Sequence, residues 1–260
     1  MADIAVTVED GVLTAVLDRP ERLNAVRERT LDELWGVLDE AERRPDVRAV
    51  VLTGRGRAFS SGQDLAEFAA QLDAPGTALA DGTARARLDR LQALTRRMLA
   101  HPKVLVAAVN GVAVGLGAEL ALACDLRIAG AGARIGFVEV TRGLFETNGA
   151  LWLLPRLVGH GRAADLLLTG DVVDAAEAHR IGLVSRLVPD ADLPVAAATL
   201  ARRVAGGAPT SVALLKRALA ATWEADLATL MEREVQGMLT CLAAPELAAG
   251  VRAFLAGEQR

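Results

Sequence analysis

Short apolar runs alternate with stretches of helical periodicity over the first three quarters of the 260-residue chain. Residues 4–8 and 12–17 alternate apolar and polar positions on either side of Asp10-Gly11, which is typical of a β-hairpin. Strands are also predicted at 47–52, 104–109, 125–128, 133–136 and 183–188. Helices are expected after Thr30, on both sides of a Pro- and Gly-rich interruption at 73–82, near 162–168 and at 172–180. This alternation favours an α/β fold.

The pattern changes after Pro194, where strand signals end. Helical segments are expected at 194–205, 209–222, 224–242 and 245–256. We therefore expect a core with the functional site at 1–193 and a C-terminal helical region at 194–260, used for assembly and for closing the site.

Composition narrows the class of protein. Hydrophobic residues make up 52% of the chain but aromatic residues only 3%, with no Tyr, so we expect an aliphatic core and no tyrosine chemistry. A net charge of −4 argues against general affinity for nucleic acid. The two cysteines form no metal or redox motif, and Cys124 fits a buried small hydrophobe. With no signal-peptide pattern and no membrane-length apolar run, we expect a cytoplasmic protein with no membrane partner. We also expect no bound metal.

A strand–turn–helix pattern at 104–128 is the first candidate for chemistry. The apolar strand is followed by Gly115-Leu116-Gly117, and Glu119 lies in the first turn of the following helix. The first N–H groups of a helix lack internal partners and attract negative charge. The N–H of Leu116 could bind an oxygen that becomes negative, while Glu119 handles a proton beside it. Equally, these glycines could serve packing, and Glu119 could be a favourable N-terminal charge.

A second turn, Ser60-Ser61-Gly62-Gln63-Asp64, also follows an apolar strand and precedes a helix. If the two turns converge, the N–H groups of Gln63 and Leu116 form an oxyanion hole. The alternative is an ordinary turn capped by a serine side chain. Sequence does not decide between them.

The second carboxylate candidate is Glu139, which has apolar neighbours on both sides. Burial near Glu119 would separate the two pKa values and allow one acid and one base. A surface position at a strand end is the alternative. His101, followed by Pro102, is interpreted as a helix-terminal residue and not a catalytic one.

Four motifs carry a resemblance to a known family. RPERLNA at 19–25, GRAFSSGQDL at 56–65, AVNGVAVGLGAEL at 108–120 and FVEVTRGL at 137–144 resemble the enoyl-CoA hydratase/isomerase, or crotonase, superfamily. The resemblance extends from about Ala5 to Phe254. It implies a ββα spiral core with a C-terminal helical trimerisation region, assembled as a homotrimer or a dimer of trimers.

The resemblance also implies an acyl-CoA thioester substrate and no separate cofactor, because coenzyme A is part of the substrate. It places the thioester oxygen between the N–H groups of Gln63 and Leu116. Lys216 and Phe254 would reach the CoA of a neighbouring subunit. The complete set of implied substrate and CoA contacts is Arg22, Leu23, Ala25, Ser61, Asp64, Leu65, Gly115, Lys216 and Phe254.

In hydratases of the family, two glutamates that match Glu119 and Glu139 handle water. One deprotonates the water that attacks C3, and the other supplies the α-proton. In Δ3,Δ2-isomerases, a single glutamate at the position of Glu139 moves a proton from C2 to C4. The presence of both carboxylates favours the hydratase, with the isomerase or another crotonase-type reaction as alternative. A CoA-ester-binding protein with a decayed site is a third hypothesis.

Glu146 departs from the family pattern, which usually has Pro near this position. It could be a third carboxylate at the acyl pocket or merely a charge at a helix N-terminus. Contact with substrate would favour a polar acyl group or a different reaction of the family.

Overall fold

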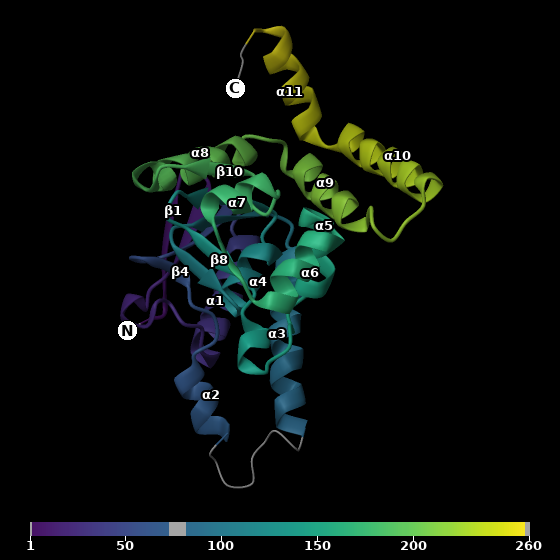
Figure 1. The fold of residues 1–260 in the computed structure, drawn as a ribbon. Coiled ribbons are helices and arrows are strands. Elements are labelled where there is room, and N and C mark those ends of the chain that lie inside the picture. The colour runs from purple at the N-terminus through teal and green to yellow at the C-terminus, as the bar shows by residue number, and fades with distance from the viewer. Residues whose placement is uncertain (1, 73–81, 258–260) are drawn as a thin grey trace.

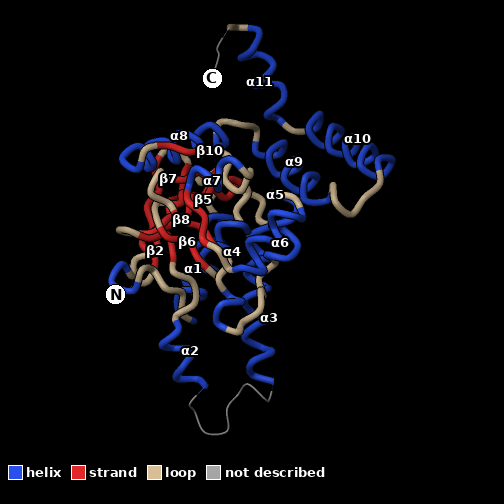
Figure 2. Tube along the Cα trace, viewed as in Figure 1, coloured by secondary structure: helices blue, strands red, loops and turns tan. Residues whose placement is uncertain are grey.

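The computed structural model describes residues 2–72 and 82–257, which form two β-sheets surrounded by helices (Figures 1 and 2). The larger sheet has the strand order β1 (Ile4–Glu9), β2 (Val12–Leu17), β3 (Ala49–Gly54), β5 (Val104–Val109), β7 (Leu126–Gly130) and β10 (Arg186–Val188). The smaller sheet has the order β4 (Ala58–Ser60), β6 (Val112–Val114), β8 (Arg134–Gly136) and β9 (Val172–Asp174).

The N-terminal hairpin is confirmed. β1 and β2 pair antiparallel, with Ile4 opposite Leu17 and Glu9 opposite Val12. The connecting Asp10 and Gly11 have φ values of 49° and 77°. A two-residue turn with positive φ at both positions matches the right-handed twist of the strands it joins.

The two sheets are built by a repeated step. A strand of the larger sheet is followed by a short strand of the smaller one in the pairs β3–β4, β5–β6 and β7–β8, and the strands within each sheet then pair in parallel. This repeat confirms the expected α/β spiral. The strands β4 and β6 were not predicted, because three residues next to glycine are too short to show a period.

One predicted helix is wrong in its first turn. Residues 172–180 were expected to be helical, but Val172–Asp174 form β9, antiparallel to β8, and the helix α7 spans Ala175–Arg180. Asp174 ends the strand and starts the helix, since its side chain accepts a hydrogen bond from the N–H of Glu177 at 2.9 Å.

Among the described residues, six further α-helices lie in the first three quarters of the chain. They are α1 (Glu28–Arg43), α2 (Leu65–Leu72), α3 (Gly82–Ala100), α4 (Leu116–Ala123), α5 (Ala150–Val158) and α6 (His160–Thr169). α2 and the start of α3 project away from the sheets (Figure 1). The predicted interruption between α2 and α3 lies, apart from Gly82, outside the described residues. His101 follows the last residue of α3 and its ring contacts the carbonyl oxygens of Leu38 and Lys103, which confirms the helix-terminal interpretation.

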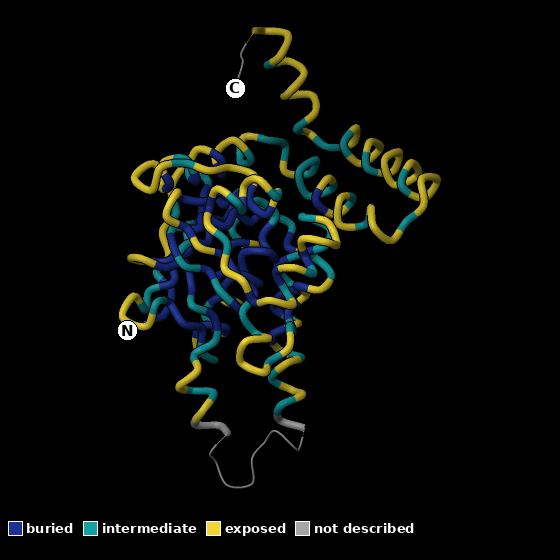
Figure 3. The backbone as a smooth tube through the Cα atoms, in the orientation of Figure 1, coloured by how far each residue is buried: buried dark blue, intermediate teal, exposed yellow. Residues whose placement is uncertain are grey.

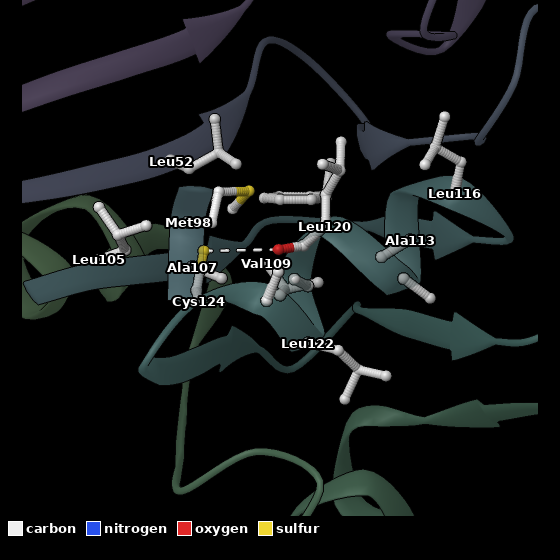
Figure 4. Packing of buried hydrophobic residues seen from close by; sticks show 14 of the residues in the cluster. Leu52, Met98, Leu105, Ala107, Val109, Ala113, Leu116, Leu120, Leu122 and Cys124 are labelled. Atoms are coloured by element: carbon white, nitrogen blue, oxygen red, sulfur yellow. Dashed lines mark hydrogen bonds between the residues drawn. The ribbon is translucent and has the colours of Figure 1, made fainter. Parts of the chain in front are cut away.

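The core is mostly aliphatic, as the composition predicts, and the buried residues concentrate around the sheets (Figure 3). All residues of α4 are buried, an unusual setting for a helix that carries a glutamate. Cys124 packs at the end of this helix among aliphatic side chains, and its Sγ lies 3.5 Å from the carbonyl oxygen of Leu120 (Figure 4). This burial confirms that Cys124 acts as a small hydrophobe.

The C-terminal quarter is helical, as predicted. It contains α8 (Leu193–Ala205), α9 (Pro209–Ala221), α10 (Leu227–Ala243) and α11 (Pro245–Leu255). α8 packs on β2, β3, β5 and β7 of the larger sheet, whereas α10 contacts α9 and projects, with α11, away from the sheets (Figure 1). No single helix among the described residues is long and apolar enough to cross a membrane, and only α10 and α11 together reach that length and apolarity, across a 78° bend.

Candidate active site

A cavity of about 720 Å³ lies at the N-terminal end of α4. Its wall comes from the 61–63 turn, α2, α3, the start of α4 and the segment 138–148. The residues that line it include Ser61, Gly62, Gln63, Leu65, Phe68, Leu88, Leu91, Gly115, Leu116, Glu119, Glu139, Leu144, Phe145, Thr147 and Asn148. Apolar side chains predominate, and the carboxylates of Glu119 and Glu139 are among the polar groups of the wall.

The two glycine-bearing turns converge on this cavity. A Cβ on Gly62 would lie 2.7 Å from the carbonyl oxygen of Val114 and 3.2 Å from the backbone N of Leu116. A Cβ on Gly117 would lie 2.4 Å from the carbonyl oxygen of Ser60. Real Cβ contacts are never this short to backbone atoms, so glycine at these positions lets the turns touch.

Local structure orients the two backbone donors. Gly62 accepts from the N–H of Val26 at 2.7 Å, and Asp64 donates to the carbonyl oxygen of Val26 at 2.8 Å. Because neighbouring N–H groups of an extended segment point to opposite sides, the N–H of Gln63 points away from Val26. Leu116 is the first residue of α4, where an N–H group has no partner inside the helix. Both residues line the cavity.

Glu119 is 2% exposed and its carboxylate is held by three donors. Oε1 accepts from the backbone N–H groups of Thr147 at 3.3 Å and Asn148 at 2.9 Å. Oε2 accepts from Nδ2 of Asn148 at 2.7 Å. These bonds fix the direction of the carboxylate and anchor residues 147–148 to α4.

Glu139 begins a 3₁₀ helix, η2 (Glu139–Arg142), and its carboxylate lies against the turn before α4. Its Oε1 is so close to Gly115 that a Cβ there would lie 2.9 Å away. Burial raises the pKa of Glu139, and the charge of Glu119 raises it further, against the lowering effect of a hydrogen bond with Glu146. A raised pKa keeps a larger fraction of the carboxyl group protonated, so that it can act as a general acid.

Glu146 joins these two residues but does not line the cavity. One carboxylate oxygen from each of Glu119, Glu139 and Glu146 lies within 4.8 Å of the others. We call these three residues the carboxyl triad. Burial, followed by the charge of Glu139, raises the pKa of Glu146 to about 10. The expected position at the acyl pocket therefore differs from the observed one, because the Glu146 side chain points to the other carboxyl groups and not into the cavity wall.

By distance alone, three such oxygens could ligate one cation. Glu119 already accepts three hydrogen bonds, and Glu146 prefers its neutral form. The arrangement favours a shared proton over a metal ion.

Some of the expected substrate contacts line the cavity, and others lie beside it. Ser61, Leu65 and Gly115 are in its wall. The loop with Arg22, Leu23 and Ala25 lies beside the 61–64 turn, since the N–H of Ser61 donates to the carbonyl oxygen of Leu23 at 2.9 Å. The Asp64 carboxylate pairs with Arg19 at 2.9 Å and is not part of the wall.

Two expected CoA contacts are far from this cavity. The ammonium group of Lys216 is buried and binds Oδ2 of Asp125 at 2.7 Å and two backbone carbonyl oxygens, so all three of its donors are used. This interior ion pair leaves Lys216 no free N–H, and its expected contact with the CoA of a neighbouring subunit stays a prediction. Phe254 is 79% exposed on α11, away from α4 (Figure 1).

Asn148 is a site residue that sequence reasoning missed. It is buried, lines the cavity and supplies two of the three donors to Glu119. The signal that was available is the Asn148-Gly149 pair directly before α5, a polar turn beside an apolar helix.

Comparison with known proteins agrees with this architecture. Residues 7–260 match the family model described as enoyl-CoA hydratase/isomerase. The chain is 38% identical to 1,2-epoxyphenylacetyl-CoA isomerase of Escherichia coli, over 96% of this chain and 94% of that protein. It is 34% identical to short-chain-enoyl-CoA hydratase of Clostridium acetobutylicum, over 95% and 92%. The crystal structure of an enoyl-CoA hydratase from Bacillus anthracis superimposes with a TM-score of 0.91 at 32% identity, covering 98% of this chain and 96% of that one. A repeated strand–strand spiral, two touching glycine turns and a match over nearly the whole chain lead to one conclusion: this protein belongs to the enoyl-CoA hydratase/isomerase family, the crotonase superfamily.

Proposed function

We propose that the protein is an enoyl-CoA hydratase that adds water across the 2,3 double bond of a 2-enoyl-CoA thioester. The observation that carries the proposal is the arrival of two carboxylates, from α4 and η2, at one cavity beside two backbone N–H groups. An apolar wall with a few convergent polar groups suits a ligand whose acyl chain is apolar.

The reaction assigns one task to each group. Glu119 accepts a proton from water, and the water oxygen attacks C3. The π electrons of the double bond move onto the thioester oxygen, where the N–H groups of Gln63 and Leu116 bind the enolate. The enolate then collapses as Glu139 gives its proton to C2, which leaves a 3-hydroxyacyl-CoA.

The environments of the two glutamates support this division. Three hydrogen-bond donors point at the oxygens of Glu119 and favour its ionised form, which is the form that can accept a proton from water. Burial and the neighbouring charge raise the pKa of Glu139, which suits a proton donor. Two carboxyl groups with separated pKa values commonly divide acid and base roles in this way.

The test measures the loss of enoyl-thioester absorbance with crotonyl-CoA and longer 2-enoyl-CoA substrates. We expect Glu119→Gln and Glu139→Gln each to lower kcat by about 10²–10⁴-fold, the usual contribution of a general acid or base. Glu224→Gln, at an exposed site after α9, is the control. A wild-type protein without activity on this panel, or a Glu119→Gln variant with full activity, contradicts the proposal.

A Δ3,Δ2-enoyl-CoA isomerase is the second candidate, and the pairing of Glu139 with Glu146 favours it. A carboxylate that can give and take a proton beside a neutral partner could move a proton from C2 to C4 without Glu119. On a 3-enoyl-CoA, the isomerase requires that Glu139→Gln abolishes activity and Glu119→Gln retains it; equal loss in both contradicts it.

We further propose that α9–α11 assemble the protein as a homotrimer or a dimer of trimers. Large apolar side chains are exposed along these helices at Leu227, Met231, Val235, Met238, Leu239, Leu242, Val251, Phe254 and Leu255. Large apolar side chains exposed together in this way are typical of a subunit interface. Light scattering coupled to gel filtration tests the assembly, and a monomer at micromolar concentration contradicts it.

A further inference from the structure

We propose that Glu146 is a positioning residue that stores a proton with Glu139 and relays a proton from Glu119 back to Glu139 after each turnover. The inference rests on the proposed hydration and adds a third carboxyl group to it. It follows from the contacts of the carboxyl triad.

The first step concerns hydrogen-bond partners. Within the part of the chain that the structure describes, the buried Oε2 atoms of Glu139 and Glu146 receive no N–H or O–H donor from other residues. An ionised carboxylate has acceptors only, so two ionised groups cannot bond to one another. One oxygen of Glu139 and one of Glu146 lie within 4.8 Å of each other, so a proton on one of the two groups removes the repulsion between two ionised carboxylates. A pair of like charges in a buried site shares one proton for the same reason.

The second step concerns the state of the site after one hydration. Glu119 then holds a proton from water, and Glu139 has lost its proton to C2. The site is ready for another substrate only when a proton has left Glu119 and one has returned to Glu139. The total number of protons in the site does not change in this transfer, so it needs a path for a proton and no further reactant.

The third step concerns where that path runs. Glu119 and Glu139 both line the cavity, so the bound acyl group separates them from solvent on that side. Glu146 is not in the wall, and one of its carboxyl oxygens lies within 4.8 Å of an oxygen of each of them. It can therefore take a proton from Glu119 and pass a proton to Glu139 while the cavity is filled.

The test compares Glu146→Gln with Glu146→Asp. Glutamine keeps the shape and an N–H donor but cannot take up and release a carboxyl proton, whereas aspartate can. We expect Glu146→Gln to make the first turnover at nearly the wild-type rate and later turnovers about tenfold or more slowly, with KM unchanged. Rapid mixing then shows a burst in the loss of enoyl-thioester absorbance, and Glu146→Asp restores part of the steady-state rate.

Two kinetic outcomes overturn the relay. A Glu146→Gln variant with wild-type steady-state rate and pH profile shows that no proton passes through Glu146. A variant that is slow from the first turnover, without a burst, shows that Glu146 only shapes the site. Glu224→Gln is the matched control for removing one surface carboxyl group.

A measurement without substrate separates this inference from the proposed function. In carbon-13 NMR of glutamate-labelled protein, we expect one side-chain carboxyl group of the wild type and of Glu224→Gln to titrate above neutral pH, and Glu146→Gln to lose that titration. Its persistence in Glu146→Gln overturns the storage of a proton on Glu146. If the titration behaves as expected but no 2-enoyl-CoA is hydrated, the hydratase proposal and the relay fail together while the shared proton stands.

Discussion

Two groups of ionisable side chains in the described part of the chain, an ion pair at α9 and the carboxyl triad, are built on opposite rules. Beneath α9, Lys216 pairs with Asp125, and the Oδ2 of Asp125 also accepts from the N–H of Leu105 at 2.8 Å. Every donor of the ammonium group is used. Burial raises the pKa of Asp125, and the nearby positive charge of Lys216 opposes that rise. This pair is neutral as a unit and reaches no cavity-lining residue.

The carboxyl triad combines charges of one sign instead. It leaves two buried oxygens without a protein donor and opens onto a cavity. Such an arrangement costs folding free energy unless a proton is held there. The comparison teaches that burial of charge alone does not mark a site; burial without neutralisation does. Three substitutions test this difference.

The largest effect is expected at the neutral pair. Lys216→Met leaves the carboxylate of Asp125, whose side chain is 24% exposed, without its partner, so we expect a loss of about 3 kcal/mol of unfolding free energy, the lower end for a buried pair. Urea denaturation measures it. Adding Asp125→Asn to that variant removes the uncompensated charge and should recover much of the loss. A Lys216→Met protein as stable as the wild type would show that the pair carries no such role.

A smaller effect is expected where the triad meets its scaffold. In Gly115→Ala, the new Cβ would lie 2.9 Å from Oε1 of Glu139, at a residue with a φ of 55°. The carboxyl group must move, and displacement of a reacting group by about 1 Å can cost about 10²-fold in rate. Steady-state hydration assays test this. Gly36→Ala in α1, where a Cβ has open space, is the control and should retain full activity.

The smallest effect concerns how the free energy of unfolding depends on pH. Glu146→Gln is expected to stabilise the protein, whereas Lys216→Met is expected to destabilise it. The pKa of Glu146 is raised in the folded protein, so the folded state binds more protons than the unfolded state between the ordinary glutamate pKa and about 10. Stability must therefore fall as pH rises through this window. We expect Glu146→Gln to melt at a higher temperature than the wild type, with a gain that grows from pH 6 to pH 9. A gain that does not depend on pH would place the cause outside this titration.

The local parts of the fold could be predicted from sequence. The hairpin turn at Asp10-Gly11 and the strand–turn–helix around Leu116 each need only neighbouring residues. The strand β9 was missed because Val172 and Val173 precede a helical pattern without a break, and only the pairing with β8 makes them a strand.

The site could be predicted in its parts but not in its assembly. Glu119 and Glu139 were found by their apolar neighbours, yet the contact of Gly62 with Leu116 depends on two sheets that no local pattern describes. The direction of Glu146 depends on the backbone after η2, where Gly143 has a φ of 70°. The burial of Lys216 depends on how α9 docks against residues 98–125, more than ninety positions earlier in the chain.

The three hydrogen bonds to Glu119 have a consequence for how variants of this protein are read. Glu119 has a structural role besides its proposed catalytic one, since its oxygens bind the backbone N–H groups of Thr147 and Asn148. These two residues line the cavity. Truncation of Glu119 removes these hydrogen bonds and releases that part of the cavity wall. A lower kcat would then have two causes, the loss of the proton acceptor and a change in the shape of the cavity. The affinity for a product-like 3-hydroxyacyl-CoA separates the two causes. It is retained when only the proton acceptor is lost, and it falls when the cavity wall has moved.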